Sequence, residues 1–238
     1  MSVFVILPAA GIGTRMASAA GADPKAAPKQ FLSLKGTPIL VHSLQAFLAV
    51  PEVSNIYVAV REPEKPRIDE LLAEYKLGNK ISVVTGGDSR QSSVANALAA
   101  LPSNSDNDIV LVHDAVRPLI DPATIQRTIE AIQKHGAAIV GLLAVDTIKQ
   151  VDRTADGAII SSTIPRERVV LAQTPQGARF GLLKNAFAEA TADEFAGTDE
   201  ASLLERVGTT VAVVPGTPRN LKITQPGDLE LAEFYLAR

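Results

Sequence analysis

The sequence predicts an α/β fold whose mainly parallel sheet is covered by helices on both faces. Short β-branched runs recur along the chain, and segments with helical spacing lie between them; the expected strands are 3–7, 55–60, 80–85, 109–112, 137–145 and 210–214. Such runs are typical of strands that are buried on both faces. Alternation of strand and helix favours right-handed crossovers, and ligands of such sheets bind at the carboxyl ends of the strands.

Two helices carry clear start and stop signals. Thr37 and Pro38 precede an apolar run at 39–44, and Asp121 and Pro122 precede the segment 123–134, which Gly136 follows. Proline in the first helical turn and glycine after the last residue are the positions that each favours.

The segment 146–164 departs from this alternation. Two β-prone runs flank the turn signal from Thr154 to Gly157, which predicts a protruding hairpin. An isolated two-stranded ribbon is only marginally stable, so we expect it to pack against its copy in a homodimer or, as the alternative, against its own domain. The predicted organisation is a single domain at 1–238 with 146–164 inserted as a dimerisation arm.

Composition excludes several classes of function. The chain has 238 residues, a net charge of −3 and three His. It has no Cys, and this absence excludes a thiolate nucleophile, a disulfide framework and Cys-ligated metal sites. No global basic field favours nucleic acid. The apolar run at 137–145 is far shorter than the roughly 20 residues of a membrane span. The N-terminal residues indicate a first strand rather than a signal peptide, so we expect a cytoplasmic protein.

The first expected strand leads directly into a loop of small residues at 8–16. Such a loop lets backbone N–H groups approach a phosphate closely, although a tight strand-to-helix turn would explain it equally well. Three cations follow, Arg15, Lys25 and Lys29, and fixed cations beside a phosphate cradle suit polyanion chemistry. The alternative for Lys25 and Lys29 is an ordinary solvated surface charge, which we favour for Lys25.

Asp114 follows the expected strand 109–112 and therefore lies at its carboxyl end. Magnesium needs only one or two protein carboxylates when substrate phosphates complete its shell, so Asp114 is a candidate Mg²⁺ ligand. A helix cap or an ion pair with Arg117 is the structural alternative. We interpret His113 as a packing residue and give no histidine a catalytic role.

Polar groups follow later in the chain at three further sites. Thr174 to Gln176 stands at a strand or helix end, and Thr198 to Ser202 is explained by helix capping alone. Lys222 lies in a β-prone run between Leu221 and Ile223, so its side chain is expected to face away from theirs, toward a pocket.

Taken in order, these motifs resemble the 2-C-methyl-D-erythritol 4-phosphate cytidylyltransferase family. The similarity extends over residues 8–224, and it rests on the set of motifs rather than on any single one; the motifs are 8–16 with 28–30, 113–118, 146–147, 174–176, 198–202 and 220–224. The resemblance implies a Rossmann-like sheet of the nucleotide-diphospho-sugar transferase type, with the hairpin as an arm. It implies transfer of a cytidylyl group from CTP to the acceptor, with release of pyrophosphate and with Mg²⁺ as cofactor.

The resemblance also implies roles for individual residues. Arg15 and Lys29 would stabilise charge on the α-phosphate, and Asp114 would anchor Mg²⁺. The nucleotide site would comprise the backbone of Ala9, Ala10, Gly11 and Gly13, the cytosine contacts Gly87, Asp88 and Ser93, and Ala115, Arg117, Thr174 and Thr198. The acceptor would meet Asp146, Thr147 and Lys222, and an arginine from the partner's arm; Arg166 matches best and Arg168 is the alternative.

Two other functions remain open at this point. A cytidylyltransferase for another polyol phosphate, such as ribitol 5-phosphate, would use the same CTP site. A catalytically inactive nucleotide-binding module is the alternative of a different class, and the joint presence of Arg15, Lys29, Asp114 and Lys222 argues against it.

Overall fold

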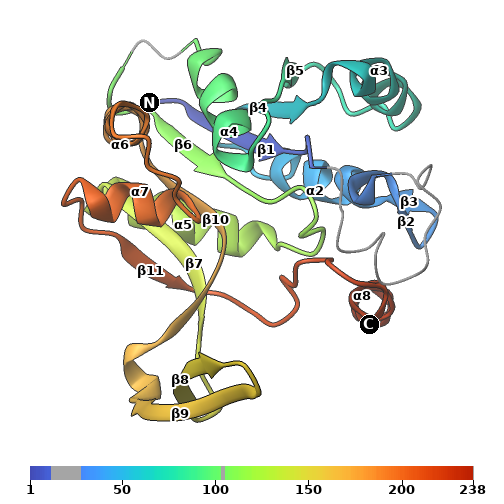
Figure 1. The fold of residues 1–238 in the computed structure, drawn as a ribbon. Coiled ribbons are helices and arrows are strands. Elements are labelled where there is room, and N and C mark those ends of the chain that lie inside the picture. Colours follow the sequence, from blue (N-terminus) through green and yellow to red (C-terminus); the bar gives the residue numbers. More distant parts are fainter. Residues whose placement is uncertain (12–27, 103–104, 238) are drawn as a thin grey trace.

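A seven-stranded sheet forms the centre of the protein in the computed structural model, which describes residues 1–11, 28–102 and 105–237 (Figure 1). The strands follow one another in space as β11 (Ala212–Pro215), β7 (Ala137–Leu143), β10 (Val170–Arg179), β6 (Ile109–Val112), β1 (Val3–Pro8), β4 (Val53–Val60) and β5 (Ile81–Thr85). Strand β1 pairs in parallel with β4 and β6, as do β4 with β5 and β7 with β11. Only β10 runs antiparallel to its described neighbours, β6 and β7. The predicted mainly parallel α/β fold is confirmed.

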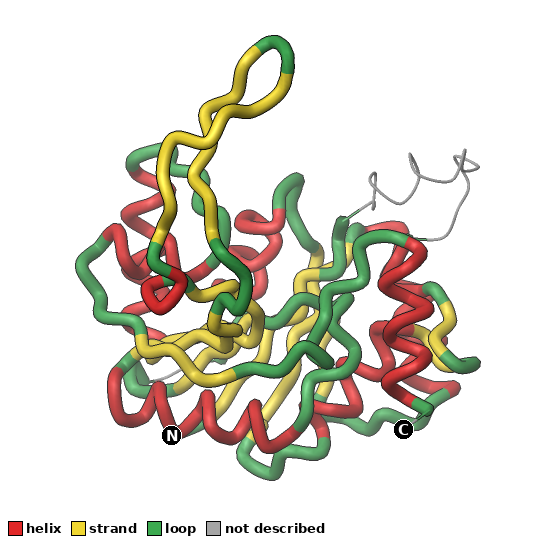
Figure 2. The backbone as a smooth tube through the Cα atoms, turned by 90° about the horizontal axis from the view of Figure 1, so that it is seen from below, coloured by secondary structure: helices red, strands yellow, loops and turns green. Residues whose placement is uncertain are grey.

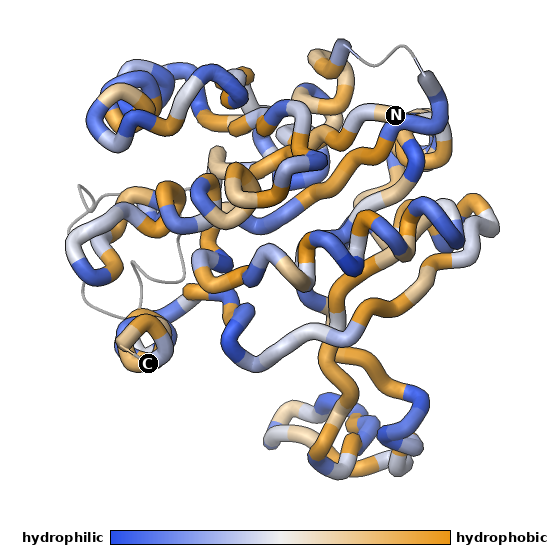
Figure 3. Tube along the Cα trace, turned by 180° about the vertical axis from the view of Figure 1, so that it is seen from behind, coloured by the Kyte–Doolittle hydropathy of each residue, from blue (hydrophilic) through white to orange (hydrophobic). Residues whose placement is uncertain are grey.

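Helices cover both faces of this sheet. Helices α2 (Ile39–Leu48), α3 (Lys65–Glu74) and α5 (Pro122–His135) pack on one face, and α4 (Arg90–Ala99), α6 (Phe180–Ala192) and α7 (Glu200–Arg206) pack on the other. Strand β1 shows why both faces are apolar: Val3, Val5 and Leu7 join the first core, whereas Phe4 and Ile6 join the second. In Figure 3 the central strands are accordingly mostly hydrophobic, and the helices mix the two colours.

The smaller elements surround this body. Helix α8 (Pro226–Leu236) and the short strand β2 (Ser33–Leu34), which pairs with β3 (Thr37–Pro38), border a small separate core, in which Leu34, Ile223 and Ala232 are buried. Three single-turn 3₁₀ helices, η1 (Lys29–Phe31), η2 (Glu62–Glu64) and η3 (Arg166–Arg168), lie in connecting segments.

The predicted helix signals act largely as expected. The Asp121 carboxylate accepts a hydrogen bond of 2.7 Å from the N–H of Thr124 at the start of α5, and Gly136 ends that helix at φ 88°. Helix α2 begins one residue later than the signal suggested, because Pro38 pairs in β3 and precedes the first helical residue, Ile39.

The hairpin predicted at 146–164 is present and projects from the body (Figure 2). Strands β8 (Ile148–Thr154) and β9 (Gly157–Ile164) pair antiparallel around the predicted turn, with Gly157 at φ 141°. Its apolar side chains face solvent in the single chain, since Val151, Ile159 and Ile160 are 45%, 64% and 61% exposed. That exposure supports a partner surface, and the homodimer stays a prediction.

Two segments differ from the sequence prediction. Strand β10 is missing from the expected strands because its central segment, Gln173 to Gly177, contains two glutamines, a proline and a glycine, none of which favours a strand, although these residues are buried between β6 and β7. The β-prone run at 220–224 forms no strand, because its backbone forms hydrogen bonds with a side chain and with a loop instead of with a neighbouring strand.

Among the described residues, no helix combines the length and the apolar composition needed to cross a membrane.

Candidate active site

A cavity of about 350 Å³ opens at the carboxyl ends of β1 and β6. The chain passes from β1 to β4 and β5 on one side and then returns to place β6 on the other side, so the sheet order reverses at β1. Open α/β sheets bind ligands at such a reversal. The cavity is lined by Pro8, Ala9, Ala10, Gly11, Lys29, Gln30, Gly87, Asp88, Ser89, Arg90, Ser93, Asp114, Ala115, Val116, Lys222, Ile223 and Thr224.

The loop after β1 presents its backbone to the cavity. Gln30 is buried behind it and donates a hydrogen bond of 2.5 Å to the carbonyl of Ala9, whose N–H donates to Ala59. A Cβ on Gly86 would lie 2.7 Å from the Cβ of Ala10, so the two walls of the cavity touch here. Only a residue without a side chain fits at 86, which keeps backbone groups close to any ligand.

The opposite wall is the start of α4. Ser89 caps this helix by accepting a hydrogen bond of 2.9 Å from the N–H of Ser92. The Ser93 hydroxyl accepts from the N–H of Gly87 at 3.0 Å and donates to the carbonyl of Ser89 at 2.8 Å. Ser93 therefore fixes the shape of the loop that carries Gly87 and Asp88.

Asp114 is the electrostatic centre of the cavity. Its Oδ1 lies 3.1 Å from Nε of Arg90, and its Oδ2 lies 2.9 Å from Nζ of Lys222 and 3.6 Å from Nε of Arg117. Burial raises the pKa of this carboxyl, but Arg90, Lys222 and Arg117 outweigh burial and hold the pKa well below its usual range. Asp114 is therefore ionised at neutral pH.

Described cations outnumber described anions on the cavity wall. Lys29, Arg90 and Lys222 line it against Asp88 and Asp114, which leaves one positive charge in excess. Lys29 donates a hydrogen bond of 2.6 Å from Nζ to the carbonyl of Thr224, which places its ammonium at the cavity. A wall of this kind attracts a polyphosphate.

The segment 220–224 is held in place by individual hydrogen bonds and not by pairing with a strand. Arg117 donates from Nη1 to the carbonyl of Asn220 at 2.7 Å, and the Asn220 amide donates to the carbonyl of Thr174 at 2.7 Å. The N–H of Ile223 donates to the carbonyl of Val116 at 2.9 Å. These bonds direct Lys222 into the cavity, as predicted, although the strand expected to do so is absent.

His113 is fully buried beside Asp114 and serves as a packing residue, as predicted. Its Nε2 lies 3.1 Å from the carbonyl of Arg117, which can only accept, so Nε2 carries the proton. Its Nδ1 accepts from the Thr174 hydroxyl at 3.0 Å, and that hydroxyl oxygen accepts from the N–H of Asp114 at 3.1 Å. Thr174 thus holds the backbone of Asp114, and burial lowers the pKa of His113 to about 4.

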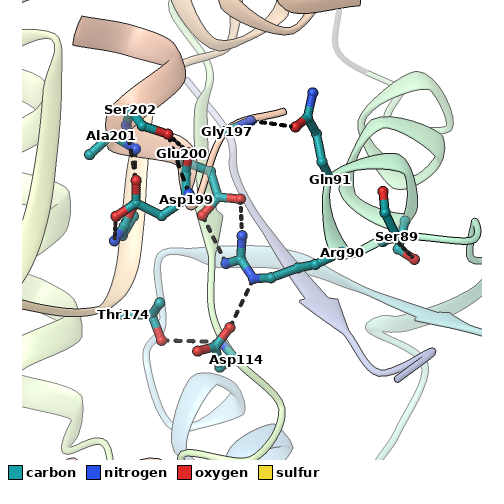
Figure 4. A network of polar contacts seen from close by, with 12 residues as sticks. Ser89, Arg90, Gln91, Asp114, Thr174, Gly197, Asp199, Glu200, Ala201 and Ser202 are labelled. Atoms are coloured by element: carbon teal, nitrogen blue, oxygen red, sulfur yellow. Dashed lines mark hydrogen bonds and ion pairs between the residues drawn. The ribbon is translucent and has the colours of Figure 1, made fainter. Parts of the chain in front are cut away.

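The structure adds two functional candidates that sequence reasoning missed, Arg90 and Glu200. Arg90 donates from Nη1 and Nη2 to the two carboxylate oxygens of Glu200 at 2.7 and 2.9 Å while its Nε holds Asp114 (Figure 4). Burial raises the pKa of Glu200, and Arg90 partly offsets this increase. Burial lowers the pKa of Arg90, but the carboxylates of Glu200 and Asp114 together raise it above its ordinary value. We treat the pair as ionised because its two-pronged geometry is that of an ion pair. The sequence shows Glu200 only as an acidic residue in the first turn of a helix, where the helix dipole alone explains it.

The remaining predicted site residues fall into three groups. Gly13, Arg15 and Lys25 lie outside the described residues. Thr198 lines a separate small cavity behind Arg90 and Glu200, and Arg117 and Thr174 support Asp114 from behind. Asp146, Thr147 and Arg166 lie at the arm and do not line the cavity of their own chain; Arg166 donates from Nη1 to the carbonyl of Val145 at 2.7 Å.

Comparison with known proteins places this site in a family. The sequence profile of 2-C-methyl-D-erythritol 4-phosphate cytidylyltransferases matches residues 3–238. The chain belongs to this family. The cytidylyltransferase of Acidobacterium capsulatum is 66% identical over 99% of this chain and 98% of that protein, and that of Solibacter usitatus is 48% identical over 99% and 96%. The predicted class of enzyme, a nucleotidyltransferase, is confirmed.

Solved structures of the family share the fold. The 4-diphosphocytidyl-2C-methyl-D-erythritol synthase of Anaerococcus prevotii superposes with a TM-score of 0.84 at 30% identity, over 100% of this chain and 96% of that one. The cytidylyltransferase of Thermus thermophilus gives a TM-score of 0.78 at 33% identity, over 100% of both chains. The α/β fold with its mostly parallel seven-stranded sheet is therefore shared with solved structures of the family.

The buried, neutral His113 predicts a defined pH dependence of stability. The unfolded chain binds its proton near the ordinary histidine pKa of about 6.5, whereas the folded chain does so only near 4, so stability present above 6.5 is lost as the pH falls toward 4. The loss from this group is about 3 kcal/mol. We expect the free energy of unfolding of His113→Gln, measured by urea titration between pH 7 and 4, to fall less steeply than that of the unmodified protein. Parallel pH profiles would contradict the assignment.

Proposed function

We propose that this protein transfers the cytidylyl group of CTP to 2-C-methyl-D-erythritol 4-phosphate, which yields 4-diphosphocytidyl-2-C-methyl-D-erythritol and pyrophosphate. The observation that carries the proposal is the cavity in which Asp114, Lys222, Arg90 and Lys29 face the backbone loop after β1. The full-length family match supports the choice of substrates.

The reaction needs positioning and charge stabilisation more than proton transfer. An oxygen of the acceptor phosphate attacks the α-phosphorus of CTP, a new P–O bond forms, and the bond to the bridging oxygen breaks so that pyrophosphate leaves with the electron pair. The nucleophile is already anionic and requires no general base. This agrees with a neutral His113 that lies behind the cavity wall instead of lining it.

Lys222 is proposed to contact the acceptor, and Lys29 is the described cation that we propose to stabilise the charge developing on the α-phosphate. In the described chain the Lys29 ammonium donates to the carbonyl of Thr224, and the Lys222 ammonium pairs with the Asp114 carboxylate. Phosphate oxygens offer stronger, charge-assisted bonds to an ammonium than a carbonyl does. Arg15, outside the described residues, is proposed for the same role.

Gly87, Asp88 and Ser93 are proposed to bind the cytosine. The loop they form lines the cavity and is fixed by the Ser93 hydroxyl, so its backbone polar groups have defined positions against a base edge. Ala9, Ala10, Gly11 and Gly13 are proposed to bring backbone N–H groups to the triphosphate.

A divalent cation fits the carboxylate of Asp114. A carboxylate offers about four acceptor positions, and the two close donors, Arg90 and Lys222, occupy one on each oxygen. Among the described residues, no three His, Cys, Asp or Glu side chains cluster to hold a metal, so substrate phosphates and water would complete the shell, as Mg²⁺ prefers. When bound, Mg²⁺ would neutralise phosphate charge and polarise phosphoryl oxygens.

The acceptor side of the site is proposed to involve a second copy of the chain. Asp146, Thr147 and Arg166 are predicted acceptor contacts, yet they lie at the arm and away from the cavity of their own chain. The exposed apolar side chains of the arm support a homodimer in which each arm reaches the partner's cavity. A cytoplasmic location stays a prediction from the sequence.

The direct test is pyrophosphate release from CTP and Mg²⁺ with 2-C-methyl-D-erythritol 4-phosphate, beside ribitol 5-phosphate and a blank without acceptor. We expect release with the methylerythritol substrate alone. Release only with ribitol 5-phosphate would retain the CTP site and overturn the acceptor. CTP binding without any release would indicate the inactive module.

Lys29→Ala should reduce kcat by about 10²–10³-fold with little change in CTP affinity, because the ammonium interacts most strongly with charge that develops in the transition state. The matched control is Lys65→Ala, since Lys65 pairs with Glu62 outside the cavity. Steady-state kinetics and CTP titration measure the two quantities. Equal losses of CTP binding and turnover would contradict the role of Lys29.

Mixed dimers test the proposed action of Arg166 across the interface. Arg166→Ala and Lys29→Ala are each expected to be strongly impaired as homodimers, whereas their heterodimer contains one intact site with Lys29 from one subunit and Arg166 from the other. We expect mixing under subunit exchange to restore activity. If exchange is demonstrated by mass and activity stays absent, Arg166 does not act in the partner's site.

A further inference from the structure

Glu200 is a buried carboxylate next to the active site that no step of the proposed reaction uses. Its side chain is 1% exposed and does not line the cavity, whereas the Arg90 side chain in front of it is 30% exposed and does. A buried carboxylate is costly unless it is fully paired, so its place directly behind a cavity wall calls for a reason.

The pairing links Glu200 to Asp114 through a single guanidinium. The two Nη atoms of Arg90 meet the two oxygens of Glu200 at 2.7 and 2.9 Å, and the Nε of the same side chain meets Oδ1 of Asp114 at 3.1 Å (Figure 4). Because a guanidinium is planar, fixing both Nη atoms also fixes the direction of Nε. The position of Glu200 therefore determines where Arg90 can hold Asp114.

Glu200 is itself firmly anchored to the sheet. Gln176 in β10 accepts a hydrogen bond of 3.0 Å from the N–H of Ala201 and donates one of 2.9 Å to the Asp199 carboxylate. Asp199 in turn caps α7 by accepting from the N–H of Ser202 at 3.0 Å. The first turn of α7 is thus clamped on both sides of Glu200.

Stability alone gives a weak reason for this arrangement. Well-packed apolar residues replace a buried ion pair with little or no loss of stability. An apolar pair, however, would not fix the orientation of a guanidinium. Without Glu200, the Arg90 guanidinium would be free to turn from Asp114 toward a bound triphosphate, which attracts it more strongly than one carboxylate does.

We propose that Glu200 is a positioning residue for nucleotidyl transfer, which acts through Arg90 to hold the Asp114 carboxylate in its reactive orientation. The inference rests on the proposed function. It predicts that Glu200 contributes to the rate of the chemical step and to the use of Mg²⁺, with little effect on CTP affinity.

Glu200→Gln is the primary test, because glutamine keeps the shape and removes the charge that binds both Nη atoms. We expect kcat to fall about 10- to 100-fold, the size typical of lost support behind a metal ligand, while the KM for CTP changes little and half-maximal activity needs more Mg²⁺. In an Arg90→Gln background, Glu200→Gln should lower kcat no further, because Glu200 acts only through Arg90.

Two controls separate positioning from folding. Glu205→Gln makes the same chemical change at an exposed position of α7, and Leu204→Ala loosens the same helix from the core without touching the ion pairs. Both should retain kcat and Mg²⁺ dependence at temperatures well below their unfolding midpoints. If Glu200→Gln does not fold, Glu200→Asp carries the same expectation, since it keeps the charge and loses the reach.

The outcomes distinguish this inference from the proposed function. Absence of cytidylyl transfer by the unmodified protein would overturn the proposed function and the inference with it. Normal transfer by the unmodified protein, combined with an unchanged kcat in Glu200→Gln or with independent, multiplicative losses in the double variant, would overturn the role of Glu200 alone.

Discussion

The shared Asp114 carboxylate is the interaction on which the rest of the site depends. Its cations come from three parts of the chain: Arg90 from the start of α4, Arg117 from the loop after β6, and Lys222 from the extended segment before α8. Each is partly or largely withdrawn from water, so the Asp114 carboxylate offsets part of the cost of placing three cations close together. Asp114 therefore organises the cavity before any substrate arrives, which limits the rearrangement that the reaction requires.

The sheet supplies the rigidity that this arrangement needs. Strand β6 ends at Val112, two residues before Asp114, and the antiparallel β10 lies beside it, which brings Thr174 to the N–H of Asp114 and Gln176 to the first turn of α7. A parallel strand at this place would reverse the direction of the chain past β6 and would move these two side chains. The single antiparallel strand of the described sheet thus connects the fold to the site.

Most of the sheet and most of the cavity could be predicted from the sequence because short segments of the sequence indicate both. β-branched runs marked six of the seven strands of the central sheet, and residues in the loops that follow strands, such as Gly11 and Asp114, marked the cavity. Sequence reasoning missed β10, whose burial comes from its neighbours rather than from its own composition. It also missed the pair of Arg90 and Glu200, because the two residues are 110 positions apart and each is explained locally as part of a helix start.

The proposed site has a nucleotide side and an acceptor side, and the acceptor side is the harder of the two to predict from one sequence. The nucleotide side is built within one chain, from loops whose backbone must approach a ligand, and such loops leave glycine and small-residue signatures. The proposed acceptor contacts Asp146, Thr147 and Arg166 lie at an arm that projects from the body of its own chain. Their placement depends on the geometry between two copies, which no pattern within one sequence specifies. In the proposed function, acceptor choice is therefore a property of the assembly, whereas the proposed CTP site belongs to the single chain.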